Sequence, residues 1–202
     1  MSIDNVKICD RPSANERKRW WLLCYAYTSM EKAIKCCQMV QTMCPNKRHP
    51  LFEPLILATH AYYARPFKPN NGVGKLSKEM VPDGLVGIHD CLIHFRDGVF
   101  CHTDAGNSSA ANRPMHDLVY SQHESVSEFS TSNPLPDIAA YSDFEAHCTA
   151  MAVIFRSEII EVEKKYSHCL PTHEGDFLMT LHDSADLFIP HTLPTRGILH
   201  YP

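Results

Sequence analysis

Apolar side chains recur at alternating intervals of three and four residues in several long segments, a pattern that predicts amphipathic helices. The first segment covers residues 13–43, and Ser13 and Glu16 have the spacing of a capping box at its start. The second covers residues 51–64, is apolar on most of its faces and stops before Pro66. We therefore expect two helices in this first part of the chain.

The same spacing returns further along the chain. A third helix is expected after Asp83, with an apolar stripe formed by Leu85, Ile88, Leu92, Phe95 and Val99. A fourth helix is expected from about Pro136 to Tyr166. Between them, residues 117–131 alternate between apolar and polar positions, which indicates a small β-hairpin.

The pattern as a whole predicts a mainly α fold: an antiparallel four-helix bundle with a small β-hairpin and an extended C-terminal tail. We assign residues 1–168 to the bundle and residues 169–202 to the tail. Two short apolar runs in the tail, FLMTL and LFI, are typical of strands or of packed extended chain. We expect the tail to pack on the bundle or at a dimer interface.

Composition narrows the functional classes. The 202 residues are 44% hydrophobic and 21% charged, as in a soluble globular protein. The formal net charge of -4 argues against a uniformly basic surface, so a nucleic acid would have to contact a local patch.

The cysteines and the N-terminus indicate a compartment. Nine cysteines, an odd number, include no C-x-x-C pair, and several occupy apolar positions of the helical pattern. We interpret them as reduced thiols of a cytoplasmic protein. The first residues are mixed in charge and precede only a short apolar run, so we expect neither a signal peptide nor a membrane span.

A cluster of reactive side chains occupies the last two turns of the third predicted helix and the residues just beyond it, in the stretch RDGVFCHTD at residues 96–104. At about 100° per residue, Arg96 and His102 lie about 120° apart on the helical wheel and flank the apolar stripe. Both can then face the same groove. His89, seven residues before Arg96, lies on the arginine's edge of that groove.

An arginine, a polar residue and then a histidine near the end of an inner helix of a bundle resembles the HEPN superfamily. The matching residues are Arg96, Asp97 and His102, with five residues between the arginine and the histidine. The resemblance covers roughly residues 13–168. It implies a homodimeric, metal-independent endoribonuclease, or an RNA- or nucleotide-binding relative of one, from a toxin–antitoxin, phage-defence or stress-response system. An antitoxin protein would be a further partner.

The residue types suit metal-free RNA cleavage, which needs proton transfer and stabilisation of charge on the phosphate. His102 can transfer protons because histidine titrates near neutrality. Arg96 can bind phosphate oxygens with its planar guanidinium, and Asp97 can orient either group. We expect no metal and no cofactor.

A second cluster lies in the loop before the third helix. This loop has four cations within fourteen residues that contain no aspartate or glutamate: Arg65, Lys68, Lys75 and Lys78. Such a patch can hold phosphates, with backbone amides exposed at Gly72 and Gly74. We predict that these cations, together with His89, bind the substrate.

Two alternatives remain open. In one, the protein is a non-catalytic homodimeric interaction module in which the region from Arg96 to His102 is structural. The other, which we favour least, is a metal-dependent hydrolase that uses His89, His102 and Asp104. The sequence has no H-E-x-x-H motif to support a metal site.

Overall fold

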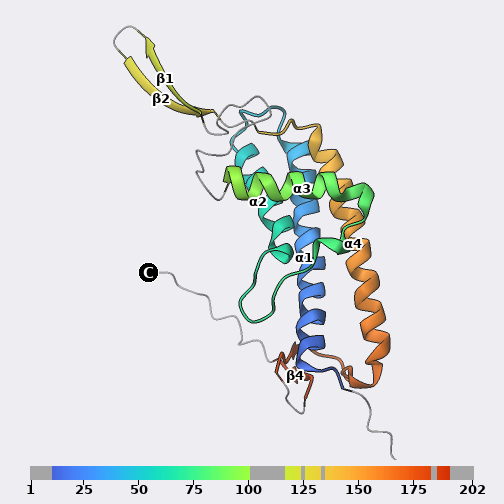
Figure 1. Ribbon diagram of the computed structural model, residues 1–202. Helices are drawn as coiled ribbons and strands as arrows, with labels where there is room; N and C mark the ends of the chain where they lie inside the picture. The colour runs from blue at the N-terminus through green and yellow to red at the C-terminus, as the bar shows by residue number, and fades with distance from the viewer. Residues whose placement is uncertain (1–10, 101–116, 124–125, 133–134, 183–185, 192–202) are drawn as a thin grey trace, which may run out of the picture.

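The computed structural model describes residues 11–100, 117–123, 126–132, 135–182 and 186–191. The protein is mainly helical and carries small antiparallel sheets of two strands each (Figure 1). The predicted mainly α class is therefore confirmed.

Helix α1 (Ala14–Met43) is the long central element of the fold. It starts at the predicted capping box: Ser13 Oγ accepts from the backbone N–H of Glu16, and the Glu16 carboxylate accepts from the backbone N–H of Ser13 at 3.0 Å. The two bonds satisfy N–H groups that have no partner inside the helix. At about 1.5 Å per residue, α1 is about 45 Å long.

Helices α2 (Phe52–Ala64) and α4 (Ala140–Lys165) pack against α1 and run antiparallel to it (Figure 1). Their buried side chains form one apolar core with those of α1. Its largest fully buried members include Tyr63, Tyr141, Phe52, Phe155, Leu23, Met30, Ile56 and Met151. Burying these apolar stripes supplies the main driving force for folding.

Helix α3 (Val86–His94) crosses the other helices at a steep angle and is followed by a π-helix, η4 (Phe95–Phe100). The expectation that the third helix continues as an α-helix to Val99 is therefore wrong. The wider turn begins where the Phe95 N–H is shared between two carbonyl oxygens, and the π-helix contains Gly98, a weak helix former. The spacing of 100° per residue does not apply beyond Phe95.

The predicted β-hairpin is present. Strand β1 (Asp117–His123) pairs antiparallel with β2 (Val126–Ser132), with Asp117 opposite Ser132 and His123 opposite Val126. Figure 1 shows this hairpin extending away from the helices.

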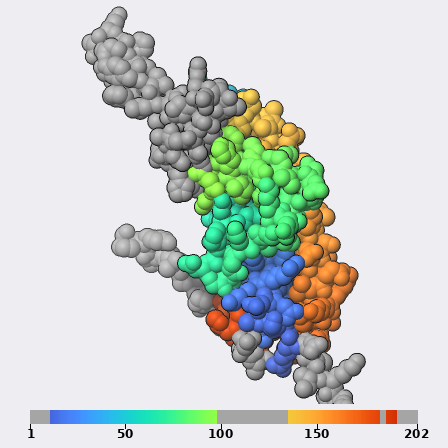
Figure 2. Space-filling view, viewed as in Figure 1, coloured from blue at the N-terminus to red at the C-terminus, as the bar shows by residue number. Residues whose placement is uncertain are grey.

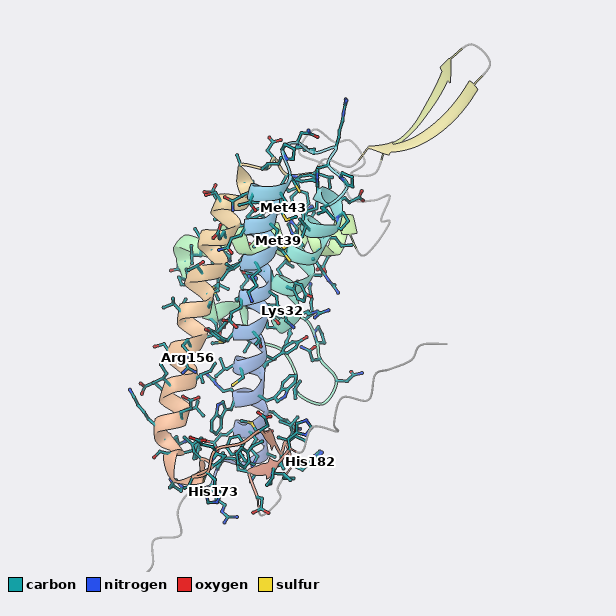
Figure 3. All side chains as sticks on the ribbon, turned by 180° about the vertical axis from the view of Figure 1, so that it is seen from behind. Lys32, Met39, Met43, Arg156, His173 and His182 are labelled. Carbon is teal, nitrogen blue, oxygen red and sulfur yellow. The ribbon has the colours of Figure 1, made fainter. Side chains whose placement is uncertain are left out.

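The described part of the C-terminal tail packs on the N-terminal end of α1 and the C-terminal end of α4. A short 3-10 helix, η5 (Ser167–Cys169), leads to strands β3 (Phe177–Met179) and β4 (Phe188–Pro190), which pair antiparallel. Leu187 joins a small core with Trp20 and Tyr166. The buried Arg17 donates to the backbone carbonyl of His182 at 2.7 Å, and Figure 3 labels His182.

Two further findings concern membrane spans and cysteines. Within the part of the chain that the structure describes, no helix is both long and apolar enough to cross a membrane. The cysteines of the described segments are free thiols: Cys24, Cys36, Cys37, Cys44, Cys91, Cys148 and Cys169.

Glu16 should make the fold acid-sensitive in a defined range. Hydrogen bonds from Lys165, Tyr166 and Ser13 lower the pKa of Glu16 from 4.5 to about 2. A lowered folded-state pKa gives stability that is present above pH 4.5 and is lost as the pH falls towards 2. Glu16→Gln keeps an N3 side chain that can cap and removes the charge. It should cost about 1 kcal/mol at pH 7, a value kept small because the Glu16 side chain is 40% exposed and water screens its charge.

Urea unfolding of both proteins at several pH values between 7 and 3 measures this effect. The difference in unfolding free energy between the parent and Glu16→Gln should shrink steadily as the pH falls below 4.5. Glu31→Gln is the matched control, because Glu31 is exposed on the same helix and has no ion pair among the described residues. A difference between the parent and Glu16→Gln that stays constant with pH would contradict the assignment.

Candidate functional site

A pocket of about 310 Å³ lies between α3 and the loop that follows α2. Figure 2 shows these segments, in green, covering one face of the helical body. The residues that line the pocket are Phe67, Lys68, Lys75, Leu76, Ser77, Lys78, His89 and Ile93. Three of the eight are lysines, so the pocket has the character of an anion site.

The loop is shaped by its backbone. It begins with a 3-10 turn, η1 (Arg65–Phe67), and ends with another, η2 (Lys78–Met80). Between them, Asn70 and Gly74 exchange two backbone hydrogen bonds of 3.0 and 2.9 Å. Gly72 and Gly74 have φ of +87° and +88°, a region that glycine enters without strain.

Apolar contacts hold this loop on α3. Phe67 and Leu76 are buried, and the Leu76 N–H donates to the carbonyl of Pro66 at 2.8 Å. The loop that carries the lysines is therefore held by the packing of Phe67 and Leu76 and by this backbone hydrogen bond.

The lysines differ in their partners. Lys78 contacts both carboxylate oxygens of Asp90, at 2.6 and 2.8 Å. Lys68 forms an ion pair with Asp97, whose other oxygen lies 2.7 Å from Arg96. Lys75 is exposed and has no ion pair among the described residues. Because an ammonium group has three donors, the paired lysines keep some capacity for a ligand.

These pairs keep both carboxylates ionised. Burial raises the pKa of Asp97, but the hydrogen bonds from Lys68 and Arg96 outweigh it, so the net shift is downward. The hydrogen bonds from Lys78 likewise lower the pKa of Asp90. At neutral pH, two of the three pocket lysines are therefore paired with ionised carboxylates.

His89 forms the inner wall of the pocket and is only 4% exposed. Its ring packs edge-on against Phe67, with centroids 4.7 Å apart. Its Nδ1 lies 2.7 Å from the hydroxyl of Tyr63, and that hydroxyl lies 2.7 Å from Nε2 of His147. A buried hydrogen-bonded chain thus runs from α4 through α2 to the pocket wall on α3.

Burial keeps this chain uncharged. Desolvation lowers the pKa of His89, and it lowers the pKa of His147 to about 4. Both imidazoles are therefore neutral at pH 7. Among the described residues, Nδ1 of His147 has no hydrogen-bond partner.

The structure brings together only some of the predicted site residues. Lys68, Lys75, Lys78 and His89 line one pocket. Arg65 is not among its lining residues, and its guanidinium instead lies over the ring of Tyr62, 4.9 Å from the centroid.

The predicted catalytic residues lie beside this pocket or outside the described part of the chain. Asp97 adjoins the pocket through its ion pair with Lys68, and Arg96 adjoins it through Asp97. His102 lies outside the described residues, so its distance from Arg96 stays a prediction.

Tyr63 and His147 were not identified from the sequence. A signal for His147 does exist, because it lies between Phe144 and Met151 at helical spacing, within the apolar stripe of α4. A polar side chain on an apolar stripe needs a partner in the core. Nothing in the local pattern indicates that the partner is Tyr63, 84 positions away along the chain.

A metal site finds no support in the described segments, where no three His, Cys, Asp or Glu side chains come together. Two of the residues named for a metal-dependent hydrolase, His102 and Asp104, lie outside those segments.

Tyr63→Phe should destabilise the protein by about 1 to 3 kcal/mol, because it strands Nδ1 of His89 and Nε2 of His147 in the core. Tyr62→Phe is the matched control: Tyr62 is adjacent on α2, is half-buried and makes no hydrogen bond among the described residues. The control should change stability by less than about 0.5 kcal/mol. Urea unfolding at pH 7 compares the variants, and equal losses of stability would contradict the buried chain.

Comparison with known proteins returns no match. No family model matches the chain, and neither a curated protein nor a solved structure matches it. The residues of the pocket and of its surroundings are therefore the basis for a functional proposal.

Proposed function

We propose that this protein binds RNA through its phosphates at the lysine pocket and cleaves the strand without a metal, using Arg96, Asp97 and His102. One observation carries the proposal. Three lysines from the loop and a histidine from α3 line a single pocket, and an ion pair connects that pocket to Asp97 and Arg96.

Phosphate is the ligand group that this lining favours. Ammonium groups attract the charge of phosphate oxygens and release the counterions of a nucleic acid. The whole protein has a formal net charge of -4, so its affinity for RNA would come from a local patch such as this one. The pocket adjoins Asp97 and Arg96, two of the predicted catalytic residues.

In this proposal Asp97 positions Arg96. Its carboxylate lies between the guanidinium of Arg96 and the ammonium of Lys68, and so fixes a bidentate donor next to the phosphate site. His102 would supply the proton transfers, five residues beyond Asp97.

The four helices would then form a HEPN-like bundle that acts as a homodimer. The antiparallel arrangement of α1, α2 and α4 supports this, whereas the steep crossing of α3 departs from a regular bundle. A dimer would place two copies of each catalytic residue near one RNA strand. The biological role we propose is defence or stress response, with an antitoxin protein as regulator.

A second candidate function is a non-catalytic module that dimerises through its helices. Two exposed methionines favour it: Met39 and Met43 lie one turn apart on α1, 39% and 45% exposed (Figure 3). Under this alternative, the ion pairs of Asp97 serve only to hold the loop on α3.

Lys75→Ala tests binding to RNA. Loss of one phosphate contact should weaken binding to a single-stranded RNA and lower the slope of log K against log salt by about 0.7. Fluorescence anisotropy at several salt concentrations gives both quantities. Lys35→Ala is the control, because Lys35 is exposed on α1 and does not line the pocket. Equal slopes for the two variants would place the RNA elsewhere.

His102→Ala tests cleavage. If His102 transfers protons, the variant should cut a mixed RNA pool about two to four orders of magnitude more slowly, while its thermal melting stays unchanged. Arg96→Ala should reduce both turnover and RNA affinity. EDTA should leave the parent enzyme fully active.

Three outcomes would contradict the proposal at different points. Unaltered cleavage in both variants would remove the catalytic assignment. Inactivation by EDTA that zinc or manganese reverses would indicate a metal-dependent hydrolase. A parent protein that neither binds nor cleaves RNA, but is dimeric by light scattering, would favour the interaction module.

A further inference from the structure

The chain from His147 through Tyr63 to His89 decides which proton His89 presents to the pocket. Nδ1 of His89 is engaged with the Tyr63 hydroxyl, so Nε2 is the ring nitrogen left for a ligand. A neutral imidazole carries its proton on one nitrogen only. The direction of the hydrogen bonds therefore determines whether Nε2 of His89 donates or accepts.

A hydroxyl has one proton, so Tyr63 donates to one histidine and accepts from the other. If Tyr63 donates to Nε2 of His147, it must accept from Nδ1 of His89, so the proton of His89 is on Nδ1. Because Nε2 of His147 is then an acceptor, the proton of His147 must be on its own Nδ1. That nitrogen has no partner among the described residues, and His147 is only 1% exposed.

The opposite direction avoids a buried N–H without an acceptor. Nε2–H of His147 then donates to Tyr63, Tyr63 donates to Nδ1 of His89, and Nδ1 of His147 is left as a bare lone pair. Among buried backbone groups, N–H groups without an acceptor are rarer than under-used acceptors, and we extend this preference to the imidazole of His147 to choose this direction. His89 consequently carries its proton on Nε2 and offers it to the pocket.

Each polar side chain of the pocket can now donate a hydrogen bond to a ligand. The three lysines donate, Nε2–H of His89 donates, and the hydroxyl of Ser77, which already accepts from the Glu79 N–H at 3.3 Å, can donate its proton. A ligand with several acceptor oxygens and no donor fits such a lining.

The charges indicate how ionised that ligand should be. The three lysines of the pocket, together with Arg96, face two paired carboxylates, Asp90 and Asp97, which leaves two positive charges. A phosphate monoester carries close to two negative charges and three terminal oxygens at pH 7. A phosphodiester within a strand carries one charge and two such oxygens.

We infer that His89 contacts the ligand as an Nε2–H donor, held in that form by Tyr63 and His147 as positioning residues, and that the pocket is selective for a phosphate monoester. This inference rests on the proposed function, since it makes the terminal phosphate of an RNA the group that the pocket prefers. A free nucleotide carries the same chemical group.

The test measures the affinity of the full-length protein for matched ligands by isothermal titration. The ligands are one RNA oligonucleotide, 2′-O-methylated so that the proposed cleavage cannot cut it, with a 5′-phosphate, a 3′-phosphate or neither, a nucleoside monophosphate, and inorganic phosphate. One of the phosphorylated oligonucleotides should bind about 10- to 100-fold more tightly than the unphosphorylated one, because it adds charge-assisted hydrogen bonds.

Two-bond ¹H–¹⁵N correlation spectra of the histidine rings show which ring nitrogen carries the proton. This property does not depend on the overall stability of the protein. In the parent protein, His89 should be protonated on Nε2 and not on Nδ1. Tyr63→Phe should abolish this fixed form and lower the ratio of affinities between phosphorylated and unphosphorylated RNA about tenfold. Tyr62→Phe should leave both unchanged.

The outcomes separate the inference from the proposed function. Equal affinity for the phosphorylated and unphosphorylated RNA, or an Nδ1–H or doubly protonated His89, overturns the inference and leaves RNA binding standing. Binding of the nucleoside monophosphate without any binding of RNA supports the inference and removes the RNA function. Binding of none of the ligands overturns both. The spectrum of the parent decides the tautomer even if Tyr63→Phe fails to fold.

Discussion

One buried hydroxyl connects three of the four helices. The oxygen of Tyr63 on α2 lies 2.7 Å from His89 on α3 and 2.7 Å from His147 on α4. The apolar core brings these helices together, and the two short hydrogen bonds to one atom add a directional constraint on how they are aligned. The orientation of α3, and with it one wall of the pocket, therefore depends on an interaction made deep inside the protein.

The pocket depends on this alignment of the helices, because His89 on α3 forms one of its walls. The loop between α2 and α3 packs through Phe67 on the ring of His89, and this contact positions the lysines above it. Ion pairs from Lys68 to Asp97 and from Lys78 to Asp90 then fasten the loop to the helical segment. The buried side chains of Phe67 and His89 fix the inner side of the pocket, so that side is preformed. The exposed side chains of Lys75 and Lys78 can adjust to a ligand at its opening.

Local pattern was sufficient for most of the fold and only part of the site. The capping box of Ser13 and Glu16 and the apolar periodicities predicted where the main helices lie, because those signals act over a few residues. The π-helix at Phe95 was not foreseen, since it depends on how a turn widens against its neighbours. The pairing of Tyr63 with His147 was missed for a related reason: it joins positions that only the folded chain brings together.

The buried chain also constrains how this protein can change through evolution. Replacing Tyr63 alone strands a nitrogen of His89 and a nitrogen of His147 in the core, whereas replacing either histidine alone leaves the Tyr63 hydroxyl with one of its two partners. Replacing all three by apolar residues of similar shape removes these buried polar atoms together with the histidine that lines the pocket. Tyr63 therefore constrains the two histidines: a descendant of this chain could exchange all three positions for apolar residues and keep its helices, but its pocket would then lack the histidine wall.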